Sequence, residues 1–472
     1  MGNDMRKICM KPFTNIRIDG EDGELELCSW IKYPIGKLSR DGMQGAWNND
    51  MARKIRSSIL DGSYRYCDKE DCVYLCNDTL PEISEEEYNT IREEVKNLPT
   101  HYWLAYDKVC NHVCPSCRKK IYIPTEEYKR KMKEMEQYLL PLLKDAEFVS
   151  VTGVGDPFAS KYTMDLLSKL KLKDENSTIL FETNGACFDE VRWDKLKNLH
   201  QYKIQIIITP NSFVEDTYRY LNGDINDYSK LQHSLTLMSK LRCEGAIERV
   251  TVTMVVQDTN YREVPEFVKK CLQEYNADEV CLRYIHYWNE MSREECWHKD
   301  VANPLHPYFE DYKRVMESPV LRDKRVVHWN GSYAHEPIEH PSVIYRYNYE
   351  MLYWATNIEN SERKVGELLK SKGVEQIVIY GATKMVTTAI RSCEAVGIKI
   401  LYILDKYNWN KNQDASGYVI KDFTGLTGEE KDILILPEYY RADIEKDLNT
   451  AGFSGNIHSY YELLKELAIE MG

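Results

Sequence analysis

Hydrophobic and polar positions follow two different periodicities through the middle of the chain. Short runs rich in β-branched and aromatic residues predict strands, and apolar residues spaced three and four apart predict helices between them. Alternation of this kind calls for a parallel sheet with crossover helices. The predicted fold class is therefore α/β, with an open or partial barrel rather than a closed one. Strands are predicted at 101–107, 147–153, 178–183, 203–209, 249–256 and 279–285, and helices at 125–144, 160–171, 188–199, 227–244 and 261–275.

The segments that flank this region have other patterns. Residues 1–80 are punctuated by Cys and Gly and have little periodicity, which is typical of a segment where a metal replaces part of a core. An acidic helical connector is predicted at 80–99. Beyond the alternating domain at 95–300, residues 301–360 are rich in Trp, Tyr, His and Pro and predict an irregular linker. A small separate α/β domain is predicted at 361–472.

Composition and charge narrow the function classes. The formal net charge of -13 argues against a surface that binds duplex nucleic acid, which needs basic patches. No apolar run approaches the length of a membrane span, and the first residues, MGNDMRKICMK, have no apolar signal-peptide core. We therefore expect a cytoplasmic protein without nucleic-acid or membrane partners. In that compartment its 14 cysteines favour metal ligation or reactivity over disulfides.

The cysteines are unevenly placed. Residues 110–117 read CNHVCPSC, so Cys110, Cys114 and Cys117 share one short loop after a predicted strand. Thiolates bind zinc and iron–sulfur clusters. A structural zinc ion needs four ligands, and His112 is the candidate for the fourth. A [4Fe–4S] cluster held by three thiolates instead leaves one iron open to a small molecule. The scattered later cysteines are expected to be small buried hydrophobic residues: Cys187, Cys243, Cys271, Cys281, Cys296 and Cys393.

The three-cysteine loop resembles the signature of the radical S-adenosylmethionine (SAM) enzymes. Three further motifs extend the resemblance over about residues 100–290: GVGDP (153–157), ETNG (182–185) and ITPNS (208–212). The resemblance implies a partial (β/α)6 barrel, SAM chelated at the open iron, and reductive cleavage to a 5′-deoxyadenosyl radical. It also implies a reductant such as flavodoxin or ferredoxin. The implied SAM contacts are Gly153, Gly155, Asp156, Asn184, Thr209 and Asn211.

The first 80 residues carry a second cysteine set. The spacing Cys-x13-Gly-x4-Cys, followed by three more cysteines, looks like a SPASM or twitch auxiliary-cluster module. The resemblance implies one auxiliary [4Fe–4S] cluster that accepts an electron from a substrate radical, and a structural zinc ribbon is the alternative. Five thiols compete for four places. The expected ligands are Cys9, Cys28, Cys67 and Cys72, with Cys76 in reserve.

Residues outside these motifs carry weaker predictions. The segment 377–386 resembles the first βαβ unit of a Rossmann-like fold, and Asp405 is placed to bind a ribose. Thr383 or Lys384 and Val386 replace the later glycines, so a docking or substrate-recruiting domain is the alternative. Arg283 and His286 could anchor a carboxylate or phosphate, or could be rim and core residues. Cys281 could donate a hydrogen atom in an epimerase, or could pack in the core.

Three functions compete at this stage. The first is oxidation of a small molecule, such as a sugar, sugar nucleotide or amino-acid derivative, by a radical SAM oxidoreductase of the dehydrogenase or epimerase type. The second is a maturase that modifies a peptide or protein, the substrate class commonest among SPASM relatives. The third is a non-enzymatic iron–sulfur scaffold or sensor in which SAM is never cleaved. The identity of the substrate does not follow from the sequence.

Overall fold

The computed structural model describes the chain in ten ranges and as two compact units. The units are Met1–Ile338 and Glu339–Gly472. The Cys-rich segment and the alternating region therefore belong to one unit, and the second unit begins earlier than the predicted 361. The described residues are 5–31, 33–69, 72–76, 78–151, 154–224, 227–287, 291–329, 331–359, 364–406 and 417–471.

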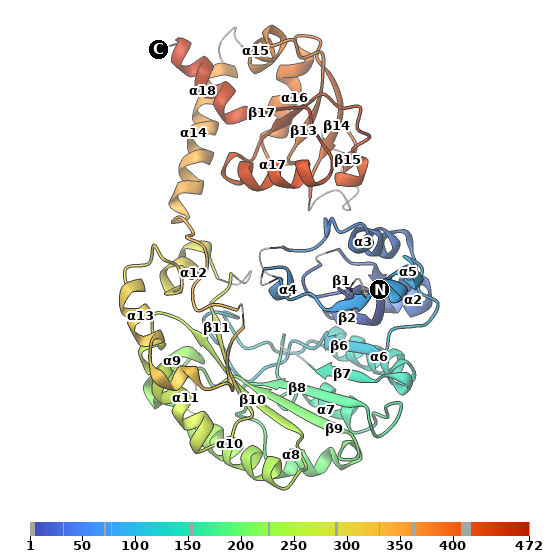
Figure 1. Ribbon diagram of the computed structural model, residues 1–472, viewed down its shortest axis with the longest axis vertical. Helices are drawn as coiled ribbons and strands as arrows, with labels where there is room; N and C mark the ends of the chain where they lie inside the picture. Colours follow the sequence, from blue (N-terminus) through green and yellow to red (C-terminus); the bar gives the residue numbers. More distant parts are fainter. Residues whose placement is uncertain are drawn as a thin grey trace. The chain divides into compact units, whose positions relative to one another are not determined.

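The first unit is built on a sheet of ten strands (Figure 1). Its central six strands are those predicted from the sequence, and they lie side by side in sequence order with parallel pairing throughout. The α/β prediction is thereby confirmed for this region. These strands are β6 (His101–Ala105), β7 (Phe148–Val151), β8 (Thr178–Thr183), β9 (Lys203–Ile208), β10 (Arg249–Val256) and β11 (Glu279–Tyr284).

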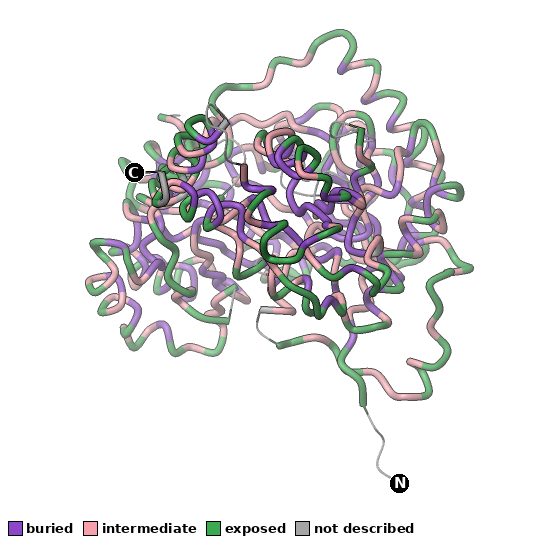
Figure 2. The backbone as a smooth tube through the Cα atoms, turned by 90° about the horizontal axis from the view of Figure 1, so that it is seen from above, coloured by how far each residue is buried: buried purple, intermediate pink, exposed green. Residues whose placement is uncertain are grey.

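Helices cover one face of this sheet because the strands turn their most apolar positions toward them. In β9, Ile204, Ile206 and Ile208 are buried, whereas the alternating Ile207 is only half-buried. Figure 2 shows how buried and exposed stretches alternate along the chain. The helices between the strands are α6 (Glu126–Leu142), α7 (Lys161–Leu167), α8 (Glu190–Lys195), α9 (Glu215–Leu221), α10 (Tyr228–Cys243) and α11 (Val264–Gln273).

The sheet continues beyond the six predicted strands at both ends. On one side β2 (Asn15–Asp19) pairs in parallel with β6, followed by β3 (Glu24–Glu26) and β4 (Gly36–Lys37). On the other side β12 (Val326–His328) pairs in parallel with β11. The two end strands do not pair with each other among the described residues, so the sheet stays open there. The N-terminal segment is thus joined to the central sheet by backbone hydrogen bonds.

The N-terminal segment also contains several short elements. Among them, β1 (Met5–Lys7) pairs antiparallel with β5 (Glu82–Ser84). Its described helices are α1 (Lys11–Thr14), α2 (Leu38–Trp47), α3 (Asp50–Leu60), α4 (Val73–Cys76) and α5 (Glu85–Thr90).

Two predictions differ from the structure. The helical connector at 80–99 is reduced to α5, which buries no residue and is held at its start by a Ser84–Glu87 capping box. A helix without a packed face gains little stability. The linker predicted at 301–360 contains α13 (Phe309–Met316), β12 and α14 (Ser342–Glu359). Its aromatic composition hides a helical pattern, since Met351, Ala355 and Ile358 are buried at helical spacing.

The second unit has a five-stranded parallel sheet in the order β15-β14-β13-β16-β17. Separate apolar clusters lie on its two faces, as expected when helices cover both sides. No described helix in either unit is long and apolar enough to cross a membrane. The strands are β13 (Gln376–Tyr380), β14 (Lys399–Leu404), β15 (Ile420–Lys421), β16 (Asp432–Ile435) and β17 (Asn456–Ser459), and the helices α15 (Val365–Ser371), α16 (Val386–Glu394), α17 (Arg441–Thr450) and α18 (Tyr460–Met471).

Candidate functional site

The three-cysteine loop follows β6 at the carboxyl edge of the parallel sheet, where βα loops commonly form active sites. The N–H groups of Cys117 and Arg118 both donate to the Cys114 carbonyl oxygen, at 2.8 and 3.0 Å, so a tight turn holds the last two thiols. The N–H of His112 donates to Cys110 Sγ at 3.5 Å. The loop thus fixes its sulfur atoms through its own backbone.

The three thiols lie close enough to affect one another. Burial raises the pKa of the Cys110 thiol to about 11, with smaller contributions from the Asp156 carboxylate and the Cys117 thiolate. Burial also raises the pKa of Cys114 to about 12, followed by the Cys110 and Cys117 thiolates. The structure therefore brings together the three residues that the sequence singled out.

Arg118 connects this loop to the next one along the sheet. Its Nη1 donates to the Lys108 carbonyl oxygen at 2.8 Å, and its Nη2 donates to the Val154 carbonyl oxygen at 2.5 Å. The same Nη2 lies 3.9 Å from Cys117 Sγ. Burial alone would lower the pKa of Arg118, but the thiolates of Cys110, Cys117 and Cys114 raise it. One guanidinium is therefore shared by the cysteine loop and the GVGDP segment.

The GVGDP segment packs against the cysteine loop through its second glycine. A Cβ atom on Gly155 would lie 2.5 Å from the carbonyl oxygens of both Asp107 and Val109. Only glycine allows this approach of two backbones. Gly155 is thus used for loop packing, a different use from the expected approach of a methionine. Gly153, also expected to contact SAM, lies outside the described residues.

Asp156 is buried, and its carboxylate is fully used within the protein. One oxygen accepts from the N–H groups of Phe158 and Ala159 at 3.0 and 3.1 Å. The other accepts from Thr183 Oγ1 at 2.7 Å and from the Asn184 N–H at 2.9 Å. A carboxylate has about four acceptor positions, so none is left for the ammonium group of SAM in this arrangement. Asp156 instead ties the loops after β7 and β8 together.

The remaining predicted contacts follow β8 and β9. Asn184 Nδ2 donates to Cys110 Sγ at 3.7 Å and to Asn111 Oδ1 at 2.9 Å, so the ETNG turn touches the cysteine loop. The N–H of Thr209 donates to the Thr183 carbonyl oxygen at 3.0 Å. Asn211 has a φ of 65°, and its Oδ1 accepts from the Val255 N–H at 2.9 Å. Asn211 therefore supports β10, and only Asn184 contacts a thiol directly.

The sequence analysis missed Asp107, the carboxylate that organises the entrance to the cysteine loop. Its side chain accepts from Tyr128 Oη at 2.7 Å, Thr163 Oγ1 at 2.8 Å, the Val109 N–H at 3.1 Å and Ser160 Oγ. Asp107 thereby anchors the start of the loop to α6 and α7. Its position two residues after the end of β6, at the carboxyl edge of the sheet, was the signal that could have found it.

His112, the proposed fourth zinc ligand, takes part in a different network. Its Nε2 pairs with Asp227 Oδ2 at 2.8 Å, and Asp227 Oδ1 accepts from Tyr218 Oη at 2.9 Å. His112 is buried, and its Nδ1 has no hydrogen-bond partner among the described residues. These contacts attach the middle of the cysteine loop to α9 and α10.

The second cysteine set also converges. Cys9 follows β1, Cys28 follows β3, Cys67 follows α3, and Cys72 precedes α4. Burial raises the pKa of Cys9 to about 12, with Cys28 and Cys72 among the other causes. Burial also raises the pKa of Cys67, followed by the thiolates of Cys28, Cys9 and Cys72. The four expected residues are thus neighbours; the side chain of Cys76 lies outside the described part.

Short links hold the segments of this second site together. The Asp68 N–H donates to the Trp30 carbonyl oxygen at 2.8 Å, joining the loops of Cys67 and Cys28. The Cys9 N–H donates to Tyr64 Oη at 3.4 Å. Lys11 Nζ lies 5.0 Å from the ring centroid of Trp103, a residue of β6. The four-thiol site is therefore in contact with the first strand of the central sheet.

Both cysteine sets offer the donor atom that zinc and iron–sulfur clusters share, because thiolates bind both. Within the described part of the chain, no three thiols of either set lie all within 4.8 Å of one another. A zinc ion and an iron–sulfur cluster both stay predictions at these sites.

The predicted ribose-binding residue of the second unit already has a partner. Asp405 Oδ2 accepts from the Ala382 N–H at 2.7 Å, which ties the end of β14 to the loop after β13. In that loop Gly381 has a φ of 106°, and a Cβ there would lie 2.9 Å from Pro437 Cδ. These contacts explain both residues structurally, and a nucleotide site stays a prediction.

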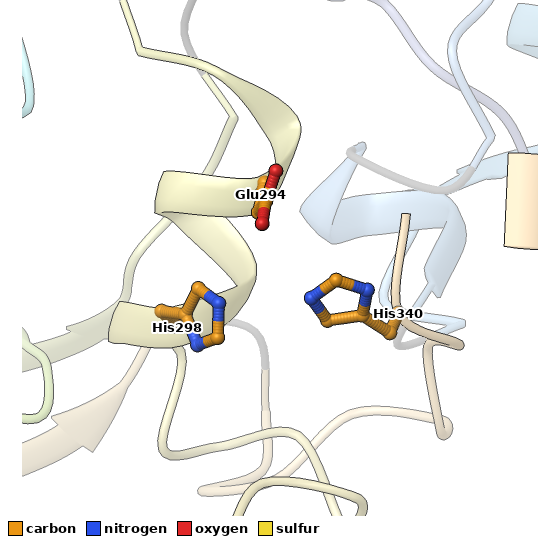
Figure 3. A group of neighbouring side chains, drawn as sticks. All are labelled: Glu294, His298 and His340. Atoms are coloured by element: carbon orange, nitrogen blue, oxygen red, sulfur yellow. The ribbon is translucent and has the colours of Figure 1, made fainter. Parts of the chain in front are cut away.

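One further pair of potential metal ligands lies on α12 (Arg293–Lys299). Glu294 and His298 are one helical turn apart and both are exposed (Figure 3). His340, also labelled in Figure 3, belongs to the second unit. Two exposed side chains on one helix do not complete a coordination sphere, so we assign no site to them.

No protein-family model matches the chain, and no curated protein matches it. Among solved structures, Streptococcus suis SuiB is 14% identical and matches over 71% of this chain and 73% of its own, with a TM-score of 0.34. The structure of SuiB bound to S-adenosylmethionine is 14% identical and matches over 68% of this chain and 73% of its own, with a TM-score of 0.33. A pyruvate kinase from Cryptosporidium parvum is 12% identical and matches over 64% of this chain and 54% of its own, with a TM-score of 0.21. Likenesses this low carry no argument about fold or function.

Proposed function

We propose that the chain is a radical SAM enzyme. Cys110, Cys114 and Cys117 would hold a [4Fe–4S] cluster with one iron left for SAM. When bound, that cluster supplies the electron that cleaves SAM to a 5′-deoxyadenosyl radical, which abstracts hydrogen from a substrate. The single observation that carries this proposal is the loop of three converging thiols at the carboxyl edge of a parallel sheet.

The surrounding residues give the loop the properties that such a site needs. The N–H of His112 and the amide of Asn184 donate toward Cys110 Sγ, and Arg118 offsets negative charge near Cys117. Hydrogen bonds and charge near cluster sulfurs set a cluster's reduction potential. Gly155 and Asp156 hold the neighbouring loops in register with the thiols. The role of the chain's own residues is to position the cluster and SAM, to orient the substrate and to exclude water.

We further propose that Cys9, Cys28, Cys67 and Cys72 hold an auxiliary [4Fe–4S] cluster. A cluster with four protein ligands can accept or give one electron but has no open iron for a substrate. Oxidation of the substrate by loss of one hydrogen atom, one proton and one further electron would suit this arrangement. Contact of Lys11 with Trp103 supports a role for this site beside the central sheet.

We propose a small-molecule substrate, such as a sugar, sugar nucleotide or amino-acid derivative. The two-faced parallel sheet of the second unit supports this class, because such sheets commonly bind small ligands at their carboxyl edge. A low-potential reductant such as flavodoxin or ferredoxin would be the partner. The many free thiols support a reducing, cytoplasmic location.

Anaerobic reconstitution with iron and sulfide tests the proposal. We expect about eight irons per chain, and 5′-deoxyadenosine formation when SAM and dithionite are added. Cys243→Ala is the matched control, because this exposed cysteine belongs to neither set. Its iron content and SAM cleavage should equal those of the wild type. Stoichiometric zinc, or clusters without any SAM cleavage, would contradict the proposed function.

A further inference from the structure

Arg283 lies at the same edge of the sheet as the three-cysteine loop. It is the fifth residue of β11, one position before the strand ends. The strands from β6 to β11 are parallel, so their carboxyl ends share one edge. Arg283 therefore lies at the edge where the loops bearing Cys110, Asp156 and Asn184 also begin.

Strand register places Arg283 on the face of the sheet opposite the buried isoleucines of β9. Val255 of β10 lies opposite Arg283, and Thr251 of β10 lies opposite Ile207 of β9. Because side chains alternate along a strand, Ile207, Thr251, Val255 and Arg283 share one face. The isoleucines on the other face of β9 are buried against helices. The same reasoning puts Trp103 of β6 on the face that Arg283 occupies.

The Arg283 guanidinium is held in place without a carboxylate. Its Cζ lies 4.2 Å from the ring centroid of Trp329. The backbone N–H of Trp329 donates to the Leu282 carbonyl oxygen at 2.9 Å, which holds this residue beside β11. No ion pair with Arg283 occurs among the described residues, and its buried Nε has no hydrogen-bond acceptor there. By contrast, Arg249 at the start of β10 pairs with Glu279 at 2.6 Å.

We propose that Arg283 and Trp329 form an anion-binding wall in the substrate site, so that the substrate carries a carboxylate or phosphate group. A guanidinium stacked on an aromatic ring is fixed in its plane and leaves its edge for two parallel N–H···O bonds. Carboxylate and phosphate both accept such bonds. The Cys281 thiol contacts the Arg283 side chain, but no carboxylate among the described residues neutralises it. In a chain with a net charge of -13, such a cation favours an anionic group.

This inference rests on the proposed function, because it assigns the carboxyl edge of the sheet beside Arg283 to the substrate. Anion binding is tested separately from turnover. The reconstituted protein is labelled with 5-fluorotryptophan, and Trp329→Phe identifies one of its nine tryptophan signals in ¹⁹F NMR. Inorganic phosphate and acetate are then titrated at constant ionic strength with SAM present in saturating amount.

We expect a saturable shift of the Trp329 signal with phosphate, acetate or both. The anion that binds more tightly indicates whether the substrate carries a phosphate or a carboxylate group. Arg283→Gln should weaken that response at least about tenfold, and Arg283→Lys should give an intermediate affinity, because lysine lacks the planar fork. Arg249→Gln is the matched control and should respond as the wild type does. The other tryptophan signals report whether each variant is folded.

Three results would overturn the inference. The Trp329 signal could fail to move with either anion, or could move equally in Arg283→Gln. Alternatively, saturating SAM could itself shift the signal and block phosphate, which would assign Arg283 to SAM. None of these results touches the proposed function, which fails only if the wild type forms no 5′-deoxyadenosine.

Discussion

The two cysteine sites use the same ligand atom in opposite surroundings. In the four-thiol site, Cys28, Cys67 and Cys72 are at most 9% exposed. In the three-thiol loop, Cys117 is exposed, Cys110 and Cys114 are half-buried, and an arginine lies beside them. The four-thiol site, with three buried thiols and a half-buried Cys9, is the more closed of the two, whereas the three-thiol loop has an exposed thiol at the edge of a sheet.

Under the proposed function, that difference would separate an electron-accepting site from a reactive one. A closed set of four ligands satisfies a cluster and takes part in folding, as metal sites in small modules do. An open set of three leaves a coordination position for chemistry. Two donors lie at Cys110 Sγ in the open set, the Asn184 amide after β8 and the backbone N–H of His112 within the loop. We therefore expect the two sites to respond differently to the same kinds of change.

The largest effect should come from removing the open site. In Cys110→Ala/Cys114→Ala/Cys117→Ala, 5′-deoxyadenosine formation under strong reductant should fall to background, because no iron can then chelate SAM. About four irons should remain, held by the other set. Chromatography of the products measures 5′-deoxyadenosine, and iron analysis measures the iron that remains bound. SAM cleavage by this variant would show that the loop is not the radical site.

Removing the closed site should separate cleavage from oxidation. Cys67→Ala/Cys72→Ala should lose about half of the iron and yet still form 5′-deoxyadenosine, while any oxidised product disappears. Circular dichroism must first show a folded chain, because loss of a buried cluster can unfold its surroundings. Undiminished oxidised product would show that this cluster is purely structural and that another acceptor takes the electron.

Loop packing is expected to support the open site only. Gly155→Ala puts a methyl group against two backbone oxygens and should lower the free energy of unfolding by about 1–3 kcal/mol. Gly45→Ala, in α2 with no atom within 4 Å of the added Cβ, should be neutral or stabilising. Urea denaturation, followed by iron absorption and circular dichroism, compares them. Equal stability of the two variants would contradict the packing role.

Arg118 should tune the open site electrostatically. In Arg118→Gln a cation is removed next to three thiolates, so the reduced cluster, which carries more negative charge, loses stabilisation. We expect about a tenfold shift toward the oxidised form, equivalent to about 59 mV more negative for one electron. A redox titration followed by electron paramagnetic resonance measures it. Lys119→Gln, the exposed neighbour, is the control; an unchanged potential in Arg118→Gln would leave Arg118 a purely structural link.

The smallest effect concerns access to the thiols. After iron is removed with a chelator, iodoacetamide should label Cys117 several-fold faster than Cys28, Cys67 or Cys72, because Cys117 is exposed and those three are buried. Peptide mass spectrometry gives the order of labelling. Rapid labelling of the buried cysteines would indicate that the closed site opens when its metal is lost.

Sequence alone determined the backbone plan of the central region. All six strands from β6 to β11 were predicted within a few residues, because period-2 runs alternate there with period-3.6 segments. The grouping of the cysteines into a set of three and a set of four was also predicted from spacing and family resemblance. The pattern failed where elements are short, as in β12, or where aromatic composition concealed a helix, as in α14.

Tertiary structure decided how the predicted residues are used. Asp156 and Asn211 have the residue types expected at a ligand, yet their oxygens accept from Thr183 and Val255. Asp107 and Arg118, which no motif marked, organise the loop through partners far along the chain. A motif records which atoms a segment can offer. Which of those atoms the protein itself takes up depends on contacts between distant segments, and these exist only once the sheet has formed.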